Sequence, residues 1–463
     1  MNNSKFYSNI FLLILVIFLY KNSFAQKDSI VNLTLQDALI LTEENNQAIK
    51  NSKIDIIIAK KKIWETTAIG LPQVNGKISY QNIFKVPEVS FGKAFYIPDN
   101  VPAETPINNV GDLRNFYIET PPLALGVKQN ITFDLTVSQL VFSGEYIVGL
   151  QATKAFKQLM ELSESKTIND AKESVKQAYY LVLVAEENFK ILKSGLELID
   201  KTYSELIQIN KAGYIEETDV DQFKINKTNL ENMIASVERQ VNLAYDLLKF
   251  QIGLENTKGI KLLDNLESII SQENAEQYIN SEFKIDNNPD YQLMLNQVTL
   301  TKLSLKREKS KFLPSIAAFY RYERLQKAPS FNFSIPHIFG VGMEIPIFGS
   351  GMKLSRVGQA KLELEKSNNT LEKVEQGLTL QYLKTKNEYI TSYNQYLSIK
   401  ENVSLTKKIY ERTLIKYKEG LSSSQELTLV QNQHLTTQAS YFNTILDVLN
   451  KKATLEKLVS NNK

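Results

Sequence analysis

The chain of 463 residues has no cysteine, only two histidines and a nearly even balance of charge. Without cysteine it has no disulfide, no catalytic thiol, no thiolate metal site and no lipidated N-terminal cysteine. His337 and His434 leave little from which to assemble a catalytic triad or a metal centre, and no glycine-rich phosphate loop or nucleophile elbow occurs. We therefore predict that the protein is not an enzyme and carries no cofactor or metal. The 54 Lys and Arg against 51 Asp and Glu also argue against a nucleic-acid partner.

Long apolar runs are scarce as well. Lys5 precedes an apolar run from Ile10 to Tyr20, which is followed by Ser23-Phe24-Ala25-Gln26. A helix that spans a bilayer needs about 20 apolar residues, whereas a basic start, a short apolar centre and a small-x-Ala end are typical of a secretory signal peptide. We predict a signal peptide at residues 1–25, cut after Ala25, in preference to a single membrane anchor. No apolar stretch of 18 residues follows, so we expect an exported chain without a transmembrane helix.

One long stretch, from Gly144 to Gly213, has unbroken three-four spacing of apolar or small residues and no proline. The residues that carry this spacing are Ile168, Ala171, Val175, Ala178, Val182, Ala185, Phe189, Leu192, Leu196, Ile199, Tyr203 and Leu206. The period predicts a helix that packs against other helices as in a left-handed coiled coil. At about 1.5 Å per residue, such a helix reaches roughly 100 Å.

The same stretch occurs twice. Moving 207 residues from Gly144 and Gly213 leads to Gly351 and Gly420, and the heptad positions shift with them. A second pair of landmarks, Asn-Asn and Leu-Pro, recurs at an offset of 242, at Asn45-Asn46 with Leu71-Pro72 and at Asn287-Asn288 with Leu313-Pro314. Self-similarity on this scale indicates a duplicated unit. We predict a first repeat at 26–253, a linker at 254–286 and a second repeat at 287–463.

After each Leu-Pro the apolar period changes from helical to two. Four strands of about ten residues are expected, around Val74–Tyr80, Ile131–Val137, Ile316–Tyr322 and Phe339–Ile347. This length fits a tilted transmembrane β-strand, although alternation alone also fits a soluble half-buried hairpin. In the membrane interpretation one set of residues faces lipid, namely Phe133, Leu135, Val341 and Ile345, and another faces the lumen, namely Thr132, Asp134 and Glu344.

Four strands cannot close a barrel, since single-chain barrels begin at about eight strands, and open edges cannot remain in lipid. Membrane strands would therefore require an oligomer. Between the first two strands, Phe84 to Val127 holds half of the 12 prolines and is expected to be a loop without regular structure. The matching link, Gln326 to Pro336, is short, and a second helix follows each of Gly213 and Gly420.

This order of elements resembles the TolC family of outer-membrane efflux proteins over essentially the whole mature chain. The motifs that carry the resemblance are Leu71-Pro72, Phe142-Ser143-Gly144, Gly213 and Thr218-Asp219-Val220, then Leu313-Pro314, Phe348-Gly349-Ser350-Gly351, Gly420 and Gln425-Glu426-Leu427. The resemblance implies a mixed fold of α and transmembrane β: a homotrimer with a shared 12-stranded β-barrel in outer-membrane lipid, four strands per chain, and a 12-helix barrel in the periplasm. A periplasmic adaptor and an inner-membrane pump would dock on the helical tunnel.

In that family the tunnel is closed at its far end, where the long helices reverse. An acidic residue six positions after the first tip glycine pairs with a tyrosine before the second glycine and with an arginine after it. The resemblance assigns the first two roles to Asp219 and Tyr417, but Ser422 stands at the arginine position. Glu426 matches a carboxylate ring, and Leu429 replaces a second one. Asp219 also has a simpler interpretation, because negative charge is favourable near the start of any helix.

Three functions compete at this point. The leading interpretation is a passive outer-membrane conduit for efflux or secretion, driven by an inner-membrane pump. The alternatives are a secreted periplasmic coiled-coil scaffold without a membrane barrel, and a binding or uptake module whose proline-rich loop captures a ligand. The alternating strands favour the conduit, because a scaffold needs no apolar stripe that faces lipid.

Overall fold

The computed structural model describes residues 30–90, 92–95, 117–119, 122–271, 282–327 and 334–459. The predicted signal peptide at 1–25 lies outside these residues. The chain forms two compact units, which cut across the two predicted repeats: unit 1 comprises Met1–Ile57, Gln158–Asn296 and Asn369–Lys463, and unit 2 comprises Ile58–Lys157 and Gln297–Asn368.

The main helices are α2 (Leu35–Asn45), α3 (Gln47–Ala68), α5 (Gly144–Lys211), α6 (Glu217–Ile252), α9 (Pro289–Ser310), α10 (Met352–Lys418) and α11 (Ser424–Val459). The predicted long helices are thus confirmed as α5, with 68 residues, and α10, with 67. None of the helices in the described residues combines the length and apolar character that a membrane crossing requires.

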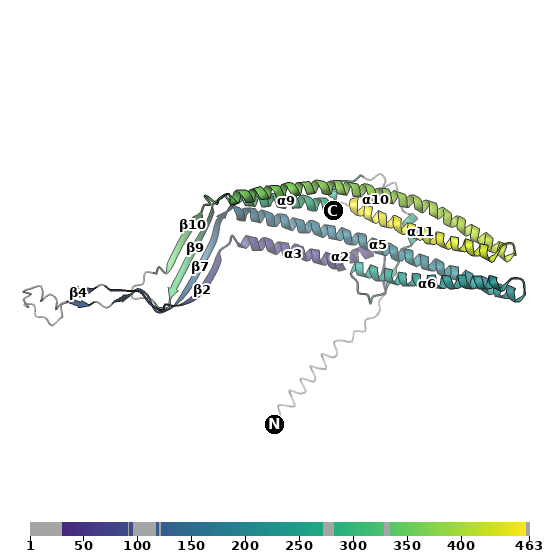
Figure 1. Ribbon diagram of the computed structural model, residues 1–463, viewed down its shortest axis with the longest axis horizontal. Helices are drawn as coiled ribbons and strands as arrows, with labels where there is room; N and C mark the ends of the chain where they lie inside the picture. The colour runs from purple at the N-terminus through teal and green to yellow at the C-terminus, as the bar shows by residue number, and fades with distance from the viewer. Residues whose placement is uncertain are drawn as a thin grey trace, which may run out of the picture. The chain divides into compact units, whose positions relative to one another are not determined.

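The four predicted strands form one sheet in unit 2 (Figure 1). They are β2 (Gln73–Asn82), β7 (Gln129–Ser143), β9 (Ser315–Leu325) and β10 (His337–Glu344), in the spatial order β10-β9-β7-β2 with every pair antiparallel. The last strand is shorter than expected and ends before Ile345, which therefore lies outside the sheet. His337 is the first residue of β10, and its ring stacks on Tyr320 and lies tilted against Tyr322.

The two faces of this sheet differ in chemistry. Because side chains alternate along each strand, the register places a mainly apolar set on one face: Val74, Ile78, Tyr80, Ile131, Phe133, Leu135, Val137, Ile316, Tyr320, Tyr322, Phe339, Val341 and Met343. The opposite face carries hydroxyl and charged groups, among which Arg321 pairs with Asp134 at 3.1 Å and also with Glu323. The apolar face is widely exposed in the single chain, with Ile78 and Phe339 each 73% exposed.

The proline-rich segment is not wholly irregular, and the prediction for Phe84 to Val127 is wrong in this respect. Short antiparallel ladders join β3 (Glu88–Val89) to β6 (Leu123–Ala124) and β4 (Lys93–Phe95) to β5 (Tyr117–Glu119). The two arms of the segment run side by side, so their backbone groups bond to each other at positions between the prolines. Proline blocks only the donor at its own position.

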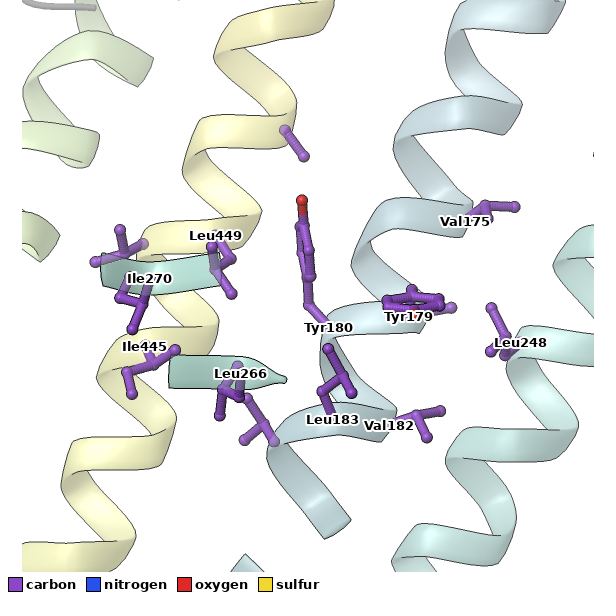
Figure 2. Packing of buried hydrophobic residues seen from close by; sticks show 14 of the residues in the cluster. Val175, Tyr179, Tyr180, Val182, Leu183, Leu248, Leu266, Ile270, Ile445 and Leu449 are labelled. Carbon is purple, nitrogen blue, oxygen red and sulfur yellow. The ribbon is translucent and has the colours of Figure 1, made fainter. Parts of the chain in front are cut away.

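In unit 1, α5 packs on two sides. Figure 2 shows Tyr179 and Val182 pointing toward Leu248 of α6, whereas Tyr180 and Leu183 point toward α11. All of these side chains are at most 4% exposed. The spacing read from the sequence identified the first side through Val175 and Val182 but not the second, because a single heptad stripe describes one contact face only.

The seam of α10 has large and small residues in alternation. Tyr382, Tyr389 and Tyr396 follow each other at seven-residue spacing and are buried. Thr385 and Ser392, three residues after the first two tyrosines, are also buried. Large rings packed beside small hydroxyl side chains fill a helix interface without overpacking.

Two asparagines make matching contacts at the corresponding positions of the two predicted repeats. Asn46 Oδ1 and Asn288 Oδ1 each accept a hydrogen bond at 2.9 Å from the backbone N–H two residues later, which caps α3 and α9. Their Nδ2 atoms donate to the carbonyl oxygens of Gln251 at 2.7 Å and of Leu458 at 3.4 Å. These two acceptors are 207 residues apart, the offset found for the glycines, so the same contact holds each repeat together.

A short segment before α2 is tied to the linker between the repeats. β1 (Val31–Leu33) pairs in parallel with β8 (Ile260–Leu262), and the linker also forms α7 (Leu266–Ser271) and a 3-10 turn at Ile285–Asn287. Asp264 Oδ2 accepts from Leu35 N at 2.7 Å and from the Tyr179 hydroxyl at 2.7 Å. Burial, followed by the hydrogen bond to Asp264, raises the pKa of Tyr179 well above its usual range.

Replacement of Asp264 by Ala should therefore loosen the start of α2, because it leaves the Leu35 N–H and the Tyr179 hydroxyl without their carboxylate acceptor. We expect a loss of roughly 1–3 kcal/mol and faster hydrogen exchange over residues 31–45. Asp246→Ala is the control, since Asp246 is exposed and pairs, among the described residues, with Lys249 on its own helix. Equal effects of the two substitutions would show that Asp264 has no special role.

Candidate functional site at the helix reversals

The two predicted tip glycines reverse the long helices of unit 1. Gly213 has φ +78° and Gly420 has φ +74°, a left-handed conformation that glycine adopts without steric cost. Each forms a Schellman motif, in which the next residue's N–H bonds five residues back and the glycine N–H bonds three residues back. The bonds are Tyr214 N to Ile209 O, Gly213 N to Asn210 O, Leu421 N to Lys416 O and Gly420 N to Tyr417 O.

The start of α11 organises the residues around Glu426. Ser423 Oγ accepts from Glu426 N at 3.1 Å, which caps the helix. The hydroxyl of Ser422, at the position where the family has arginine, donates to Glu426 Oε2 at 2.7 Å. Ser422 thus bonds within its own turn and, having no charge, offers no ion pair to the rest of the tip.

The predicted hydrogen bond between Asp219 and Tyr417 is not formed between these described residues. Asp219 Oδ1 instead accepts a short hydrogen bond from the Ser424 hydroxyl. This bond links the first turn of α6 to the first turn of α11 and therefore joins the two repeats.

Tyr417 contributes its ring rather than its hydroxyl. The ring stacks on Phe223 of α6, with centroids 5.7 Å apart. Its hydroxyl oxygen is buried and has no hydrogen-bond partner among the described residues. Burial, together with a smaller contribution from the charge of Asp219, raises the pKa of Tyr417 to about 12. The phenol is therefore neutral at physiological pH and acts as an aromatic packing group.

A small apolar core lies beneath these contacts. Leu206, Phe223 and Leu427 are buried together, with Tyr417 packed against them. Asn226 Nδ2 donates to Thr428 Oγ1 at 2.8 Å, which adds a second link between α6 and α11. None of Ser424, Asn226 and Thr428 could be identified from the sequence, because serine, asparagine and threonine on a helix face have no distinctive spacing.

His434 lies on α11, farther from the reversal at Gly420, and is buried against α10. It is 9% exposed, its Nδ1 is 3.2 Å from Thr406 Oγ1, and its ring stacks on Tyr410. Burial, and then the nearby charge of Lys407, lowers the pKa of His434, which Glu411 opposes. A cavity of 280 Å³ adjoins it, lined in part by Gly195, Leu198 and Leu414. Nowhere in the described residues do three His, Asp or Glu side chains gather in a way that could hold a metal.

Residues 285–461 match the profile of the family described as outer membrane efflux protein. No curated protein matches the chain in sequence. The matched range covers the second repeat from its Asn-Asn landmark onward, and it confirms the resemblance to TolC-like outer-membrane efflux proteins.

Solved structures show the same fold over nearly the whole chain. The CusC transmembrane channel is 14% identical, with 95% of this chain and 96% of that chain covered and a TM-score of 0.72. The Campylobacter jejuni CmeC outer membrane channel is 18% identical, with coverage of 92% and 85% and a TM-score of 0.67. The open state of the Neisseria gonorrhoeae MtrE outer membrane channel is 13% identical, with coverage of 92% and 88% and a TM-score of 0.70. At such identities the similarity is one of fold.

The lowered pKa of His434 predicts a loss of stability in mild acid. Below pH 6.5 His434 binds a proton in the unfolded chain, whereas the buried imidazole of the folded chain stays neutral to lower pH. The free energy of unfolding therefore falls as pH falls below 6.5. Between pH 7.5 and 5, the thermal midpoint should fall more steeply for the wild type than for His434→Gln. Gln431→Ala, in the same buried seam, should lower the midpoint equally at every pH. Parallel curves for wild type and His434→Gln would contradict the assignment.

Proposed function

We propose that the protein is an outer-membrane channel of a tripartite export system, a passive conduit from periplasm to outside through which an inner-membrane pump drives efflux or secretion. The observation that carries this proposal is the sheet of unit 2. One of its faces is apolar and exposed, the other is polar, and β2, β7 and β9 are long enough to be transmembrane strands. The matching fold of solved outer membrane channels and the family profile support it.

The apolar face fits contact with lipid. A soluble scaffold would cover side chains such as Ile78, Phe339 and Val341, because large contiguous apolar surfaces are rarely left in water. In the proposed assembly Phe133 and Leu135 lie on this face, whereas Thr132 and Asp134 face the lumen. Glu344, on the same face as Asp134 by register, belongs with the lumen set.

The edges of the sheet call for a trimer. β2 and β10 end the strand order on either side, and the backbone groups of an open edge cannot remain unsatisfied in hydrocarbon. If β10 of one protomer pairs with β2 of the next, three chains close one barrel of 12 strands. We infer a homotrimer whose long helices form a 12-helix tunnel in the periplasm, where an adaptor protein and the pump dock.

We assign the gate of this channel to the helix reversals around Gly213 and Gly420. Asp219 holds α6 to α11 through Ser424, Tyr417 fills the space beside Phe223, and Glu426 places a carboxylate near the entrance. A carboxylate at the entrance favours cations over anions. The gate is held by hydrogen bonds and packing, with Ser422 in place of the arginine that would add an ion pair. The mature chain begins after Ala25 in this proposal, once the signal peptide has been removed.

Arginine substitutions test the membrane sheet. Leu135→Arg places a charge on the proposed lipid face near mid-bilayer and should cost roughly 2–4 kcal/mol, so little trimer should be recovered from outer-membrane fractions. Thr132→Arg, on the proposed lumen face of the same strand, should leave the yield of trimer near that of the wild type. Mass measurement in detergent reports the oligomer. Equal tolerance of the two arginines, or a stable wild-type monomer, would exclude the barrel.

Single-channel recording in planar bilayers tests the gate. Ser424→Ala removes the donor to the Asp219 carboxylate, and a hydrogen bond to a charged group contributes about 1.5–3 kcal/mol. The ratio of open to closed states should therefore rise about tenfold or more. Tyr417→Phe should leave this ratio nearly unchanged, because the ring is kept and the buried hydroxyl has no hydrogen-bond partner among the described residues. A rise with Tyr417→Phe equal to that with Ser424→Ala would show that the phenol bonds across the assembled trimer.

A further inference from the structure

The helical part of unit 2 is strongly basic. The four stretches that flank the strands, residues 58–72, 144–157, 297–314 and 345–368, hold 14 Lys and Arg against 5 Asp and Glu. Unit 1 as a whole holds 32 Lys and Arg against 38 Asp and Glu, and its acidic excess lies in residues 158–296, with 14 Lys and Arg against 24 Asp and Glu. The near-neutral composition of the chain therefore hides a segregation of charge between the two units.

Few of these cations are neutralised by neighbours. Four of the five acidic groups are already used in pairs, Glu65 with Lys62, Glu145 with Arg307, Glu308 with Lys311 and Glu363 with Lys366. The exposed cations that take part in no ion pair among the described residues include Lys60, Lys61, Lys302, Lys309, Arg356 and Lys361. We call these six residues the basic band.

The basic band lies close to the sheet. Each member is within nine residues of the helix end that leads into a strand of the sheet, at Ala68, Ser310 or Met352. At 1.5 Å per residue these positions are within about 15 Å of those ends. A charge so placed is within one or two Debye lengths of a surface at the end of the strands.

Exposed aromatic and apolar side chains accompany the basic band. Trp64, the single tryptophan of the chain, is 64% exposed and lies one helical turn after Lys60 and Lys61 on the same side of α3. At the other strand end, Ile347 and Phe348 are 92% and 89% exposed. Tryptophan and lysine at the ends of membrane-spanning elements are typical of the membrane–water interface.

A cavity of 190 Å³ lies beside Ile347 and Phe348. Phe312 and Leu354 contribute apolar walls, and Lys353 contributes a cation. The Lys353 ammonium donates to Lys311 O at 2.7 Å and lies 5.9 Å from the centre of the Phe312 ring. An apolar cavity with an ammonium at its rim has the chemistry to hold an acyl chain below a phosphate.

We propose that the basic band and this cavity bind the phosphate headgroups of anionic phospholipids in the periplasmic leaflet of the outer membrane. The proposal rests on the proposed function, because only a sheet that crosses the membrane brings these helix ends to a leaflet. Unpaired cations beside an anionic surface are attracted within a Debye length. Trp64, Ile347 and Phe348 then enter the headgroup region, and the basic band sets the depth at which the sheet stops.

Reconstituted trimers test this site. In nanodiscs of phosphatidylcholine with 30 mol% phosphatidylglycerol, the midpoint of thermal dissociation of the wild-type trimer should exceed that in pure phosphatidylcholine by about 5 °C or more. The shift should disappear in 1 M NaCl, where the Debye length falls to about 3 Å. The variant Lys60→Gln, Lys61→Gln, Arg356→Gln, Lys361→Gln should show less than half of it.

A matched control neutralises four exposed lysines of unit 1, as Lys201→Gln, Lys224→Gln, Lys373→Gln and Lys408→Gln, and should keep the full shift. An arm with glycerol phosphate at the same total concentration in neutral nanodiscs should give no shift. A full shift from the free anion would overturn the proposal in favour of a simple anion site. If the fourfold Gln variant of the basic band kept the full rise in thermal midpoint, the proposal would be overturned as well.

The failure of this proposal is distinguishable from that of the proposed function. Suppose that the wild-type protein forms trimers and conducts in neutral bilayers, yet its thermal midpoint does not rise with phosphatidylglycerol. This result would exclude the lipid site and leave the proposed channel function intact. The fourfold Gln variant of the basic band could instead change the anion selectivity of the channel while keeping the full rise in thermal midpoint with phosphatidylglycerol. This result would place the basic band on the pore and overturn its assignment to lipid. If the wild-type protein forms no trimer in any lipid, the proposed channel function is excluded.

Discussion

The burial of α5 on two sides is the constraint on which unit 1 depends. A helix of this length is not stable by itself, since most helical stability in proteins comes from tertiary packing. Tyr179 faces α6 of its own repeat and Tyr180 faces α11 of the other, so one helix binds the duplicated halves together. The segment before α2 depends on the same contact, because the Tyr179 hydroxyl and Asp264 hold it in place.

Although the two repeats share their landmarks, the interfaces of their hairpins differ in chemistry. Between α5 and α6 the buried positions are mostly apolar, as at Leu192, Ile199 and Leu230, with Thr202 as a buried polar exception. On the matching stretch of α10 and α11 they are polar: Thr406, Thr413, Gln431 and His434. Hydrogen-bonded polar seams contribute less per area than apolar ones, because desolvation offsets most of the bond energy. We therefore expect the hairpin of α10 and α11 to be held together less tightly than the hairpin of α5 and α6.

Local signals predicted much of this fold, and long-range contacts account for what was missed. Periods of two and of three-four, Leu-Pro breaks and tip glycines located the strands and reversals correctly, because each depends on neighbouring residues only. The bond between Asp219 and Ser424 depends on two residues 205 positions apart and left no trace in spacing. For the same reason the ladders β3–β6 and β4–β5 were missed, since prolines marked the segment but not its pairing. The position of Tyr417 beside the second reversal could be read from the sequence, whereas its contact with Phe223 could be seen only in the structure.

Composition sums conceal the property that most distinguishes the two units. A net charge of +3 over the whole chain excluded a generally basic protein, and that exclusion holds, but an average near zero is also what two opposite local excesses produce. The excess became visible only when the topology showed which helix ends lead into the sheet. Unit 2 has three independent features: a sheet with one exposed apolar face, an aromatic residue beyond the end of the sheet, and unpaired cations at the same level. In water the exposed apolar and aromatic surfaces cost free energy, and the unpaired cations gain no stabilising interaction. A membrane is the one environment that accounts for all three, which is why the charge pattern and the strand pattern support the same placement of unit 2.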